Sequence, residues 1–273
     1  MRPQPPAPIG VFDSGIGGLS ILRALQAELP NERFVYLSDS AHAPYGERGD
    51  AFVNDRCFAV TQQLREQHGI KALVIACNTA TAAAIHNLRT AHPDLPVIGI
   101  EPAVKPAVAL SQTKHIGVMV TRGTAYSTKF QTLLSHLQAQ SQEPIRFTVQ
   151  ACDGLAAAIE SQNATKIRAL LADYTSAMGR FGNQKNDMDT LVLGCTHYAL
   201  AIAPLRTLVG NVVQVVDNGP AVARQTRRLL ASGHQLAPGG DPCDKAEQTN
   251  AGTLRLLATG DSSTLVNAAS HWL

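Results

Sequence analysis

The chain has 273 residues, of which 45% are hydrophobic and 16% are charged, and its formal net charge is +2. This composition is typical of a globular protein and excludes a disordered chain, and the length fits one large α/β domain or two smaller ones. The basic residues are scattered and no apolar run approaches the roughly 18 residues of a membrane helix, so we expect no nucleic-acid partner and no membrane partner.

Short apolar strands alternate with helical periodicity along the whole sequence. Strands are expected at 9–12, 33–37, 72–76, 97–100, 115–120, 145–149, 190–193, 212–216 and 253–257. Helices are expected at 19–29, 51–67, 79–89, 124–139, 155–160, 164–178, 220–230 and 263–269, and a loop at 232–250. This alternation predicts an α/β fold with mainly parallel sheets that helices cover on both faces.

The first eight residues differ from the rest of the chain, because they are rich in proline and polar. They lack the apolar centre of a signal peptide, so we expect residues 1–8 to be a disordered lead-in and the protein to be cytoplasmic.

Two segments of the sequence, 72–79 and 190–197, resemble each other. They read A-L-V-I-A-C-N-T and T-L-V-L-G-C-T-H, so each is an apolar strand that ends on a cysteine, Cys77 or Cys195. The distance between them along the chain is about one small α/β domain. Two similar domains related by pseudo-two-fold symmetry would place both thiols in the cleft between them, and we expect the active site there.

The position of these cysteines at strand ends favours chemistry. The chain has five cysteines and no C-x-x-C pair, which argues against a disulfide framework or a structural zinc site. Ligands bind at the carboxyl ends of parallel strands, and a thiol at the start of a helix ionises more readily. The alternative is that each cysteine is a small apolar side chain that fills a strand end. Two thiols in matching settings favour the reactive role.

Polar side chains beside the cysteines offer partners for them. His197 follows Cys195 by two residues and Asp13 ends the first strand, so either can hold a cysteine in the required protonation state. Donors for a substrate carboxylate are Asn78, Thr79, Thr196, Ser14 and the N–H groups of the turn at 15–18. The structural alternatives are helix caps for Asp13, Asn78 and Thr196, and a buried structural histidine for His197.

Two other kinds of site deserve comparison with a pair of thiols. The turn D-S-G-I-G-G departs from the nucleotide-binding pattern G-x-G-x-x-G and has no Walker lysine after it. Cys195 and His197 make a Cys-x-His pair, but zinc needs three or four ligands.

Two opposed thiols suit proton transfer at a carbon, because one removes a proton and the other returns one to the opposite face. On an amino acid this inverts the α-carbon, provided that donors stabilise the developing charge.

Eight short motifs follow one another along the chain. They are D-S-G-I-G-G (13–18), P-Y-G (44–46), A-C-N-T-A (76–80), I-E-P-A (100–103), T-R-G-T (121–124), L-G-C-T-H-Y (193–198), V-D-N (216–218) and A-T-G-D (258–261). In this order the chain resembles the glutamate racemases of the aspartate/glutamate racemase superfamily, from about Ile9 to the end. It departs from the family at Ala199 and at Asp153, where proline is usual.

The resemblance implies an isomerase that interconverts L- and D-glutamate without pyridoxal phosphate, metal or any other cofactor. It also implies a frequent homodimer and a supply of D-glutamate for peptidoglycan, and hence for the cell wall. The first α/β domain is expected to comprise residues 9–104 and 217–273, and the second residues 105–216, with the substrate between them.

The resemblance also assigns roles to residues. Cys77 is expected to take the proton from D-glutamate with the assistance of Asp13. Cys195 is expected to take it from L-glutamate with the assistance of His197. Four residues are expected to bind the α-amino and α-carboxylate groups: Ser14, Asn78, Thr79 and Thr196. Pro44, Tyr45 and Gly46 are expected beside the side-chain carboxylate, and Thr124 and Glu160 complete the pocket.

Two rival functions remain at this point. An aspartate racemase of the same superfamily differs in substrate by one methylene, which a pocket discriminates by only about 1–3 kcal/mol. A binding protein that keeps the fold without the chemistry, such as a gyrase-interacting relative, belongs to a different class.

Overall fold

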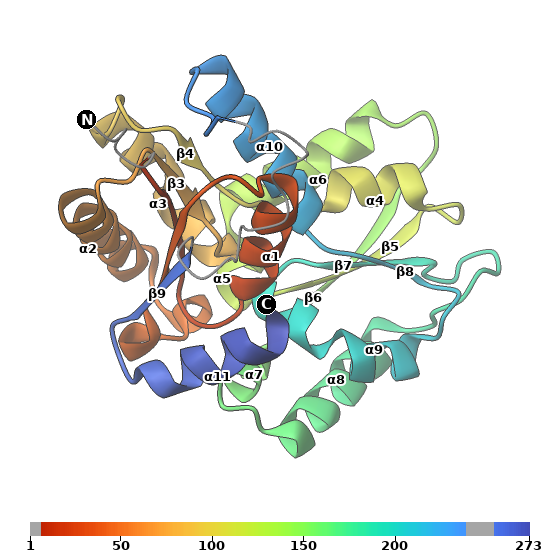
Figure 1. Cartoon of the computed structure of the whole chain (residues 1–273). Coiled ribbons are helices and arrows are strands. Elements are labelled where there is room, and N and C mark those ends of the chain that lie inside the picture. The colour runs from red at the N-terminus through yellow and green to blue at the C-terminus, as the bar shows by residue number, and fades with distance from the viewer. Residues whose placement is uncertain (1–6, 239–253) are drawn as a thin grey trace, which may run out of the picture.

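The computed structural model describes residues 7–238 and 254–273, so the predictions for residues 1–6 and for 239–253 lie outside the described residues. In the described ranges the chain forms two parallel sheets, each enclosed by helices (Figure 1). This arrangement confirms the predicted fold class. Among the helices that the structure describes, none is long and apolar enough to cross a membrane.

The first sheet has the strand order β4-β3-β1-β2-β9, and each pair of neighbouring strands in it is parallel. Its strands are β1 (Ile9–Asp13), β2 (Phe34–Ser38), β3 (Ala72–Ile75), β4 (Val97–Ile98) and β9 (Leu254–Ala258). One face packs against α1 (Leu19–Glu28), α10 (Gly219–Ser232) and α11 (Ser262–Trp272). The other face packs against α2 (Asp50–His68) and α3 (Asn78–Ala91). Burial on both faces explains why β1 is apolar without alternation.

The second sheet has the order β6-β5-β7-β8, again parallel throughout. Its strands are β5 (His115–Val120), β6 (Arg146–Ala151), β7 (Thr190–Leu193) and β8 (Gln214–Val216). Helices α7 (Leu155–Glu160), α8 (Ala164–Met178) and α9 (Ile202–Val209) cover one face. Helices α4 (Val104–Leu110), α5 (Arg122–Tyr126) and α6 (Thr128–Gln140) cover the other. The domain boundaries at 104/105 and 216/217 stay a prediction.

The cysteine-bearing strands occupy equivalent places in the two sheets. Strand β3 lies beside β1, with Ile75 opposite Phe12, and β7 lies beside β5, with Leu193 opposite Met119. Each cysteine follows its strand by two residues, so both leave the carboxyl edge of a parallel sheet in the same register.

Three helical segments differ from the prediction. The helix expected at 124–139 is two helices, because the Ser127 hydroxyl accepts a hydrogen bond from the Phe130 N–H and caps α6. Helices α4 and α9 were not expected, and each has a proline at its third residue, Pro106 or Pro204. The first N–H groups of a helix have no partner within it, so proline is tolerated there.

Candidate active site

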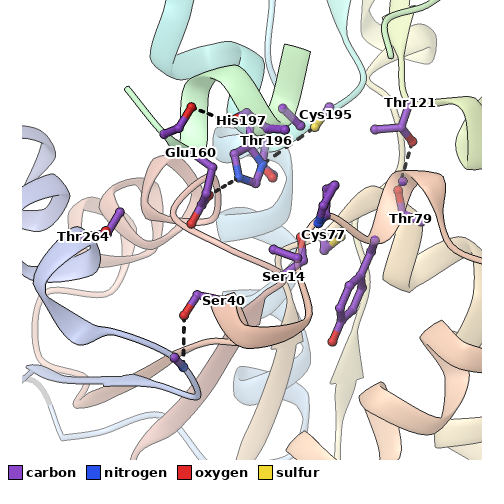
Figure 2. A pocket seen from close by; sticks show the side chains of 18 of the residues that line it. Ser14, Ser40, Cys77, Thr79, Thr121, Glu160, Cys195, Thr196, His197 and Thr264 are labelled. Atoms are coloured by element: carbon purple, nitrogen blue, oxygen red, sulfur yellow. Dashed lines mark hydrogen bonds and ion pairs between the residues drawn. The ribbon is translucent and has the colours of Figure 1, made fainter. Parts of the chain in front are cut away.

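A cavity of about 400 Å³ opens between the two sheets and contains both thiols (Figure 2). This volume is within the roughly 300–1,000 Å³ that small-molecule sites occupy. Eleven of the thirteen predicted site residues line it: Ser14, Pro44, Tyr45, Gly46, Cys77, Asn78, Thr79, Glu160, Cys195, Thr196 and His197. Asp13 and Thr124 lie behind the lining.

Cys77 lies at the start of α3 and acts as its cap. Its sulfur accepts the Ala80 N–H at 3.4 Å and lies 3.8 Å from the Ser14 hydroxyl. Burial raises the pKa of the Cys77 thiol, and the negative charge of Asp13 raises it further. The Ala80 N–H at the helix start acts to lower this pKa, as the sequence led us to expect, but burial and Asp13 outweigh it and favour the protonated form of the cysteine.

Asp13 is completely buried and connects the two halves of the molecule. Its Oδ1 accepts the Gly15 N–H at 2.8 Å and the Ser14 hydroxyl at 3.2 Å. Its Oδ2 accepts the hydroxyl of Thr196, which follows Cys195, at 2.8 Å. Burial raises the pKa of Asp13. Asp13 reaches Cys77 through Ser14, and it also fixes the residue beside the second thiol.

Cys195 has different neighbours from Cys77. The Nδ1 atom of His197 is 3.9 Å from the Cys195 sulfur, and Nε2 is 2.7 Å from Oε2 of Glu160 (Figure 2). Burial acts to lower the pKa of His197, but the contacts with Cys195 and Glu160 and the charge of Asp13 raise it well above its usual value. These contacts favour the protonated form of the imidazole beside the Cys195 thiol.

Glu160 reaches across from α7 to the glycine-rich turn of the first sheet. Its Oε2 accepts the Ile16 N–H at 2.9 Å. Burial acts to raise the pKa of Glu160, but His197 and the Ile16 N–H bring it below its usual value. The turn was expected to bind an anion from outside, and its Gly15 and Ile16 N–H groups instead bind the protein carboxylates of Asp13 and Glu160.

Gly17 is necessary at its position for steric reasons. A Cβ atom there would collide with the His197 ring and would lie 2.6 Å from the His197 backbone nitrogen.

Asn78 lines the cavity and has hydrogen-bonding groups that the described residues leave unused. Its side chain is buried, yet neither its Oδ1 nor its Nδ2 has a hydrogen-bond partner among the described residues. A buried amide without partners is costly, so this one is suited to a polar ligand in the cavity. Thr79 instead lies 3.0 Å from the Thr121 hydroxyl, and Thr121 donates to Thr124 at 3.1 Å.

The sequence profile of the Asp/Glu/Hydantoin racemase family matches residues 17–226. The chain belongs to this family. It is 47% identical over 257 residues to the glutamate racemase of Cupriavidus pinatubonensis, a match that covers 93% of this chain and 90% of that one. Racemases are isomerases, and this chain is one.

Solved structures of glutamate racemases are also similar to this chain. The RacE1 isoform from Bacillus anthracis has a TM-score of 0.80 and 30% identity, covering 97% of this chain and 93% of that chain. The Escherichia coli enzyme, solved with L-glutamate and the activator UDP-MurNAc-ala, has a TM-score of 0.77 and 27% identity, covering 98% and 96%.

Several residues of this racemase cavity were not expected from the sequence. They are Ser40, Ala41, Ala43, Thr121, Ala156, Ala157, Ser161, Gly260, Asp261 and Thr264. Two motifs contained a signal for some of them, because Thr121 begins T-R-G-T and Gly260 and Asp261 end A-T-G-D. In the described ranges, no three His, Cys, Asp or Glu side chains come together as metal ligands would.

Proposed function

We propose that the chain racemises glutamate by proton transfer between its α-carbon and two thiols, Cys77 and Cys195. The observation that carries this proposal is that two equivalent strands deliver these thiols into one cavity (Figure 2). The names of the relatives support glutamate as the substrate.

In the direction from L to D, the Cys195 thiolate removes the α-proton of L-glutamate and becomes a thiol. The electron pair stays on the α-carbon and its carboxylate. The Cys77 thiol then gives its proton to the opposite face, which yields D-glutamate and a Cys77 thiolate. The raised pKa of Cys77 and the imidazole beside Cys195 suit these starting roles. The reverse reaction exchanges the two roles, with Asp13 and Ser14 on the side of Cys77.

The polar groups near the thiols are suited to the α-substituents. The free amide of Asn78 and the hydroxyl of Ser14 supply donors, and donors aimed at the carboxylate stabilise the charge that develops in the transition state. Thr196 fits a positioning role as well, because its hydroxyl is already bound to Asp13. We place the side-chain carboxylate at Pro44, Tyr45 and Gly46. Thr124, one layer behind Thr121, supports the pocket.

The proposal extends to the setting of the reaction. We propose that the enzyme acts in the cytoplasm as a homodimer, without pyridoxal phosphate or metal, and that its D-glutamate enters peptidoglycan. Activity that is unchanged by dialysis against a chelator and by omission of pyridoxal phosphate is the expected result.

The decisive experiment is proton NMR of L-glutamate in D₂O with the purified, reduced protein, paired with polarimetry. Loss of the α-proton signal together with decay of the optical rotation is expected. A folded protein that exchanges neither glutamate nor aspartate would refute the racemase proposal. Faster turnover of L-aspartate than of L-glutamate would overturn the choice of substrate and favour the aspartate rival.

A further inference from the structure

Asp39 is a carboxylate that lies just outside the cavity and has no part in the proton transfer. It follows β2, and its side chain is completely buried. Its oxygens accept bonds from four side chains: Arg56 through Nε and Nη2 at 3.0 Å each, the Tyr45 hydroxyl at 2.5 Å, Thr259 at 2.8 Å and His42 at 3.0 Å. Burial acts to raise the pKa of Asp39, but these bonds hold it below its usual value.

The partners of Asp39 come from separate parts of the chain. Tyr45 and His42 belong to the segment between β2 and α2, Arg56 belongs to α2, and Thr259 follows β9. Further bonds join the same segments, because the Gly260 N–H donates to the Ser40 hydroxyl at 3.2 Å and the Ala41 N–H donates to Thr259 at 3.2 Å. Asp39 is the common acceptor that fixes these segments relative to one another.

These segments form one wall of the cavity. Residues 40, 41 and 43–46 line it from one segment, and residues 260, 261 and 264 line it from the other. Figure 2 shows Ser40 bonded to the loop before α11 and Thr264 on α11 itself, both bordering the cavity that holds the thiols. The distance from this wall to the thiols limits the length of side chain that the substrate can have.

We infer that Asp39 is a positioning residue that sets the side-chain specificity of the racemase. It holds this wall, which includes Tyr45, at the distance from the thiols that a five-carbon dicarboxylate needs. This inference rests on the proposed function. A carboxylate suits the position, because it accepts both guanidinium bonds of Arg56 together with three hydroxyl or imidazole donors, whereas an amide loses one acceptor atom.

The test compares Asp39→Asn with Asp189→Asn. Asp189 is a buried carboxylate directly before β7 that accepts bonds from Ser111, Thr190 and the N–H groups of Gln112 and Thr113. It lies away from the cavity lining, so it is a matched control for the loss of a buried hydrogen-bonded charge. Thermal unfolding of both variants sets an assay temperature at which each is folded.

In Asp39→Asn, we expect KM for L-glutamate to rise about tenfold with a smaller change in kcat. The ratio of kcat/KM for glutamate to kcat/KM for aspartate should decrease. The decrease should be at most about 10–200-fold, which is the discrimination that one methylene group allows. Asp189→Asn should leave both KM and this ratio unchanged. An Asp39→Asn enzyme with the KM and substrate ratio of the wild type would overturn the inference.

Two further outcomes are distinguishable. If Asp39→Asn does not fold, Arg56→Lys decides on the same criterion. It replaces the two guanidinium bonds to Asp39 and keeps the positive charge, while the bonds between residues 40–41 and 259–260 stay in place. It should shift KM and the ratio in the same direction. A wild-type protein that does not racemise glutamate contradicts the proposed function itself, whereas an active wild type with an unaltered ratio in both variants contradicts the role of Asp39 alone.

Discussion

The two cysteine sites share a backbone arrangement and differ in their side chains. Aligning Cys77 with Cys195 by strand register matches Asn78 with Thr196 and Thr79 with His197. The same register matches Asp13 of β1 with Val120 of β5. Asp13 accepts a bond from Thr196, whereas Val120 offers nothing to Asn78, whose amide is left without a partner among the described residues.

This difference shows where the molecule departs from symmetry. In the proposed reaction both thiols must be able to act as base and as acid, because each direction uses the other thiol as its acid. The substrate is not symmetric, because its α-carboxylate and α-amino groups differ. The protein is not symmetric either, because the amide of Asn78, unpaired among the described residues, lies beside Cys77, while its counterpart beside Cys195, Thr196, is already bonded to Asp13. The enantiomers have equal free energy in solution, so kcat/KM must be the same in both directions even in a variant. Asymmetry is therefore visible in kcat, in KM and in α-proton exchange.

The largest expected effect separates the two thiols. Cys77→Ser and Cys195→Ser should each lower racemisation by roughly 10³-fold or more, because serine is a much weaker acid than cysteine. In D₂O, Cys77→Ser should still exchange the α-proton of L-glutamate, and Cys195→Ser that of D-glutamate. NMR of each pure enantiomer measures this, and mild, equal effects on both enantiomers would contradict the scheme.

A methyl group at Gly17 should damage the Cys195 side selectively. In Gly17→Ala the new Cβ displaces His197. Since a shift of about 1 Å can cost 10²-fold, exchange of L-glutamate should fall by roughly that factor. Gly49→Ala is the control, because its Cβ would have no neighbour within 4 Å. Equal behaviour of the two variants would argue against a role for His197 at Cys195.

Glu160→Gln sharpens the comparison through pH. Glu160 raises the pKa of His197, so its neutral replacement should lower that pKa, and His197 should lose its proton at a lower pH than in the wild type. The pH profile of kcat for L-glutamate should therefore shift toward lower pH, in the same direction as the pKa of His197. The rate should fall roughly tenfold, about the value of one charge-assisted hydrogen bond. An NMR titration of His197 that is unchanged in the variant would be the contrary result.

The smallest effect belongs to a helix cap outside the cavity lining. Asn163 caps α8 by accepting the Lys166 N–H at 3.0 Å. Asn163→Ala should lower the free energy of unfolding by about 1 kcal/mol and leave exchange of both enantiomers unchanged. Denaturant unfolding checks the first result and NMR the second.

The meeting of Cys77 and Cys195 was predictable, because the carboxyl ends of parallel strands are the established place for ligands and the two segments resemble each other. Of the wall around Asp39, only residues 44–46 were expected, from the P-Y-G motif. The hydrogen-bond network of Asp39 was not, because its partners are spread from residue 42 to residue 259 and no local pattern joins them. The break at Ser127 was missed for a local reason, since the helical spacing of the apolar residues continues across it while the hydroxyl caps a new helix.

Strand β9 and helix α11 follow every other cavity-lining element in the chain, yet β9 pairs with β2, one of the earliest strands. Since domains fold as they emerge during synthesis, both thiols can be in place while residues 260, 261 and 264, the later part of the wall, are still absent. A nascent chain stopped before residue 254 would thus expose an unfinished sheet edge along β2. Residues 260, 261 and 264 therefore complete the cavity only after the segments that carry both thiols have been made.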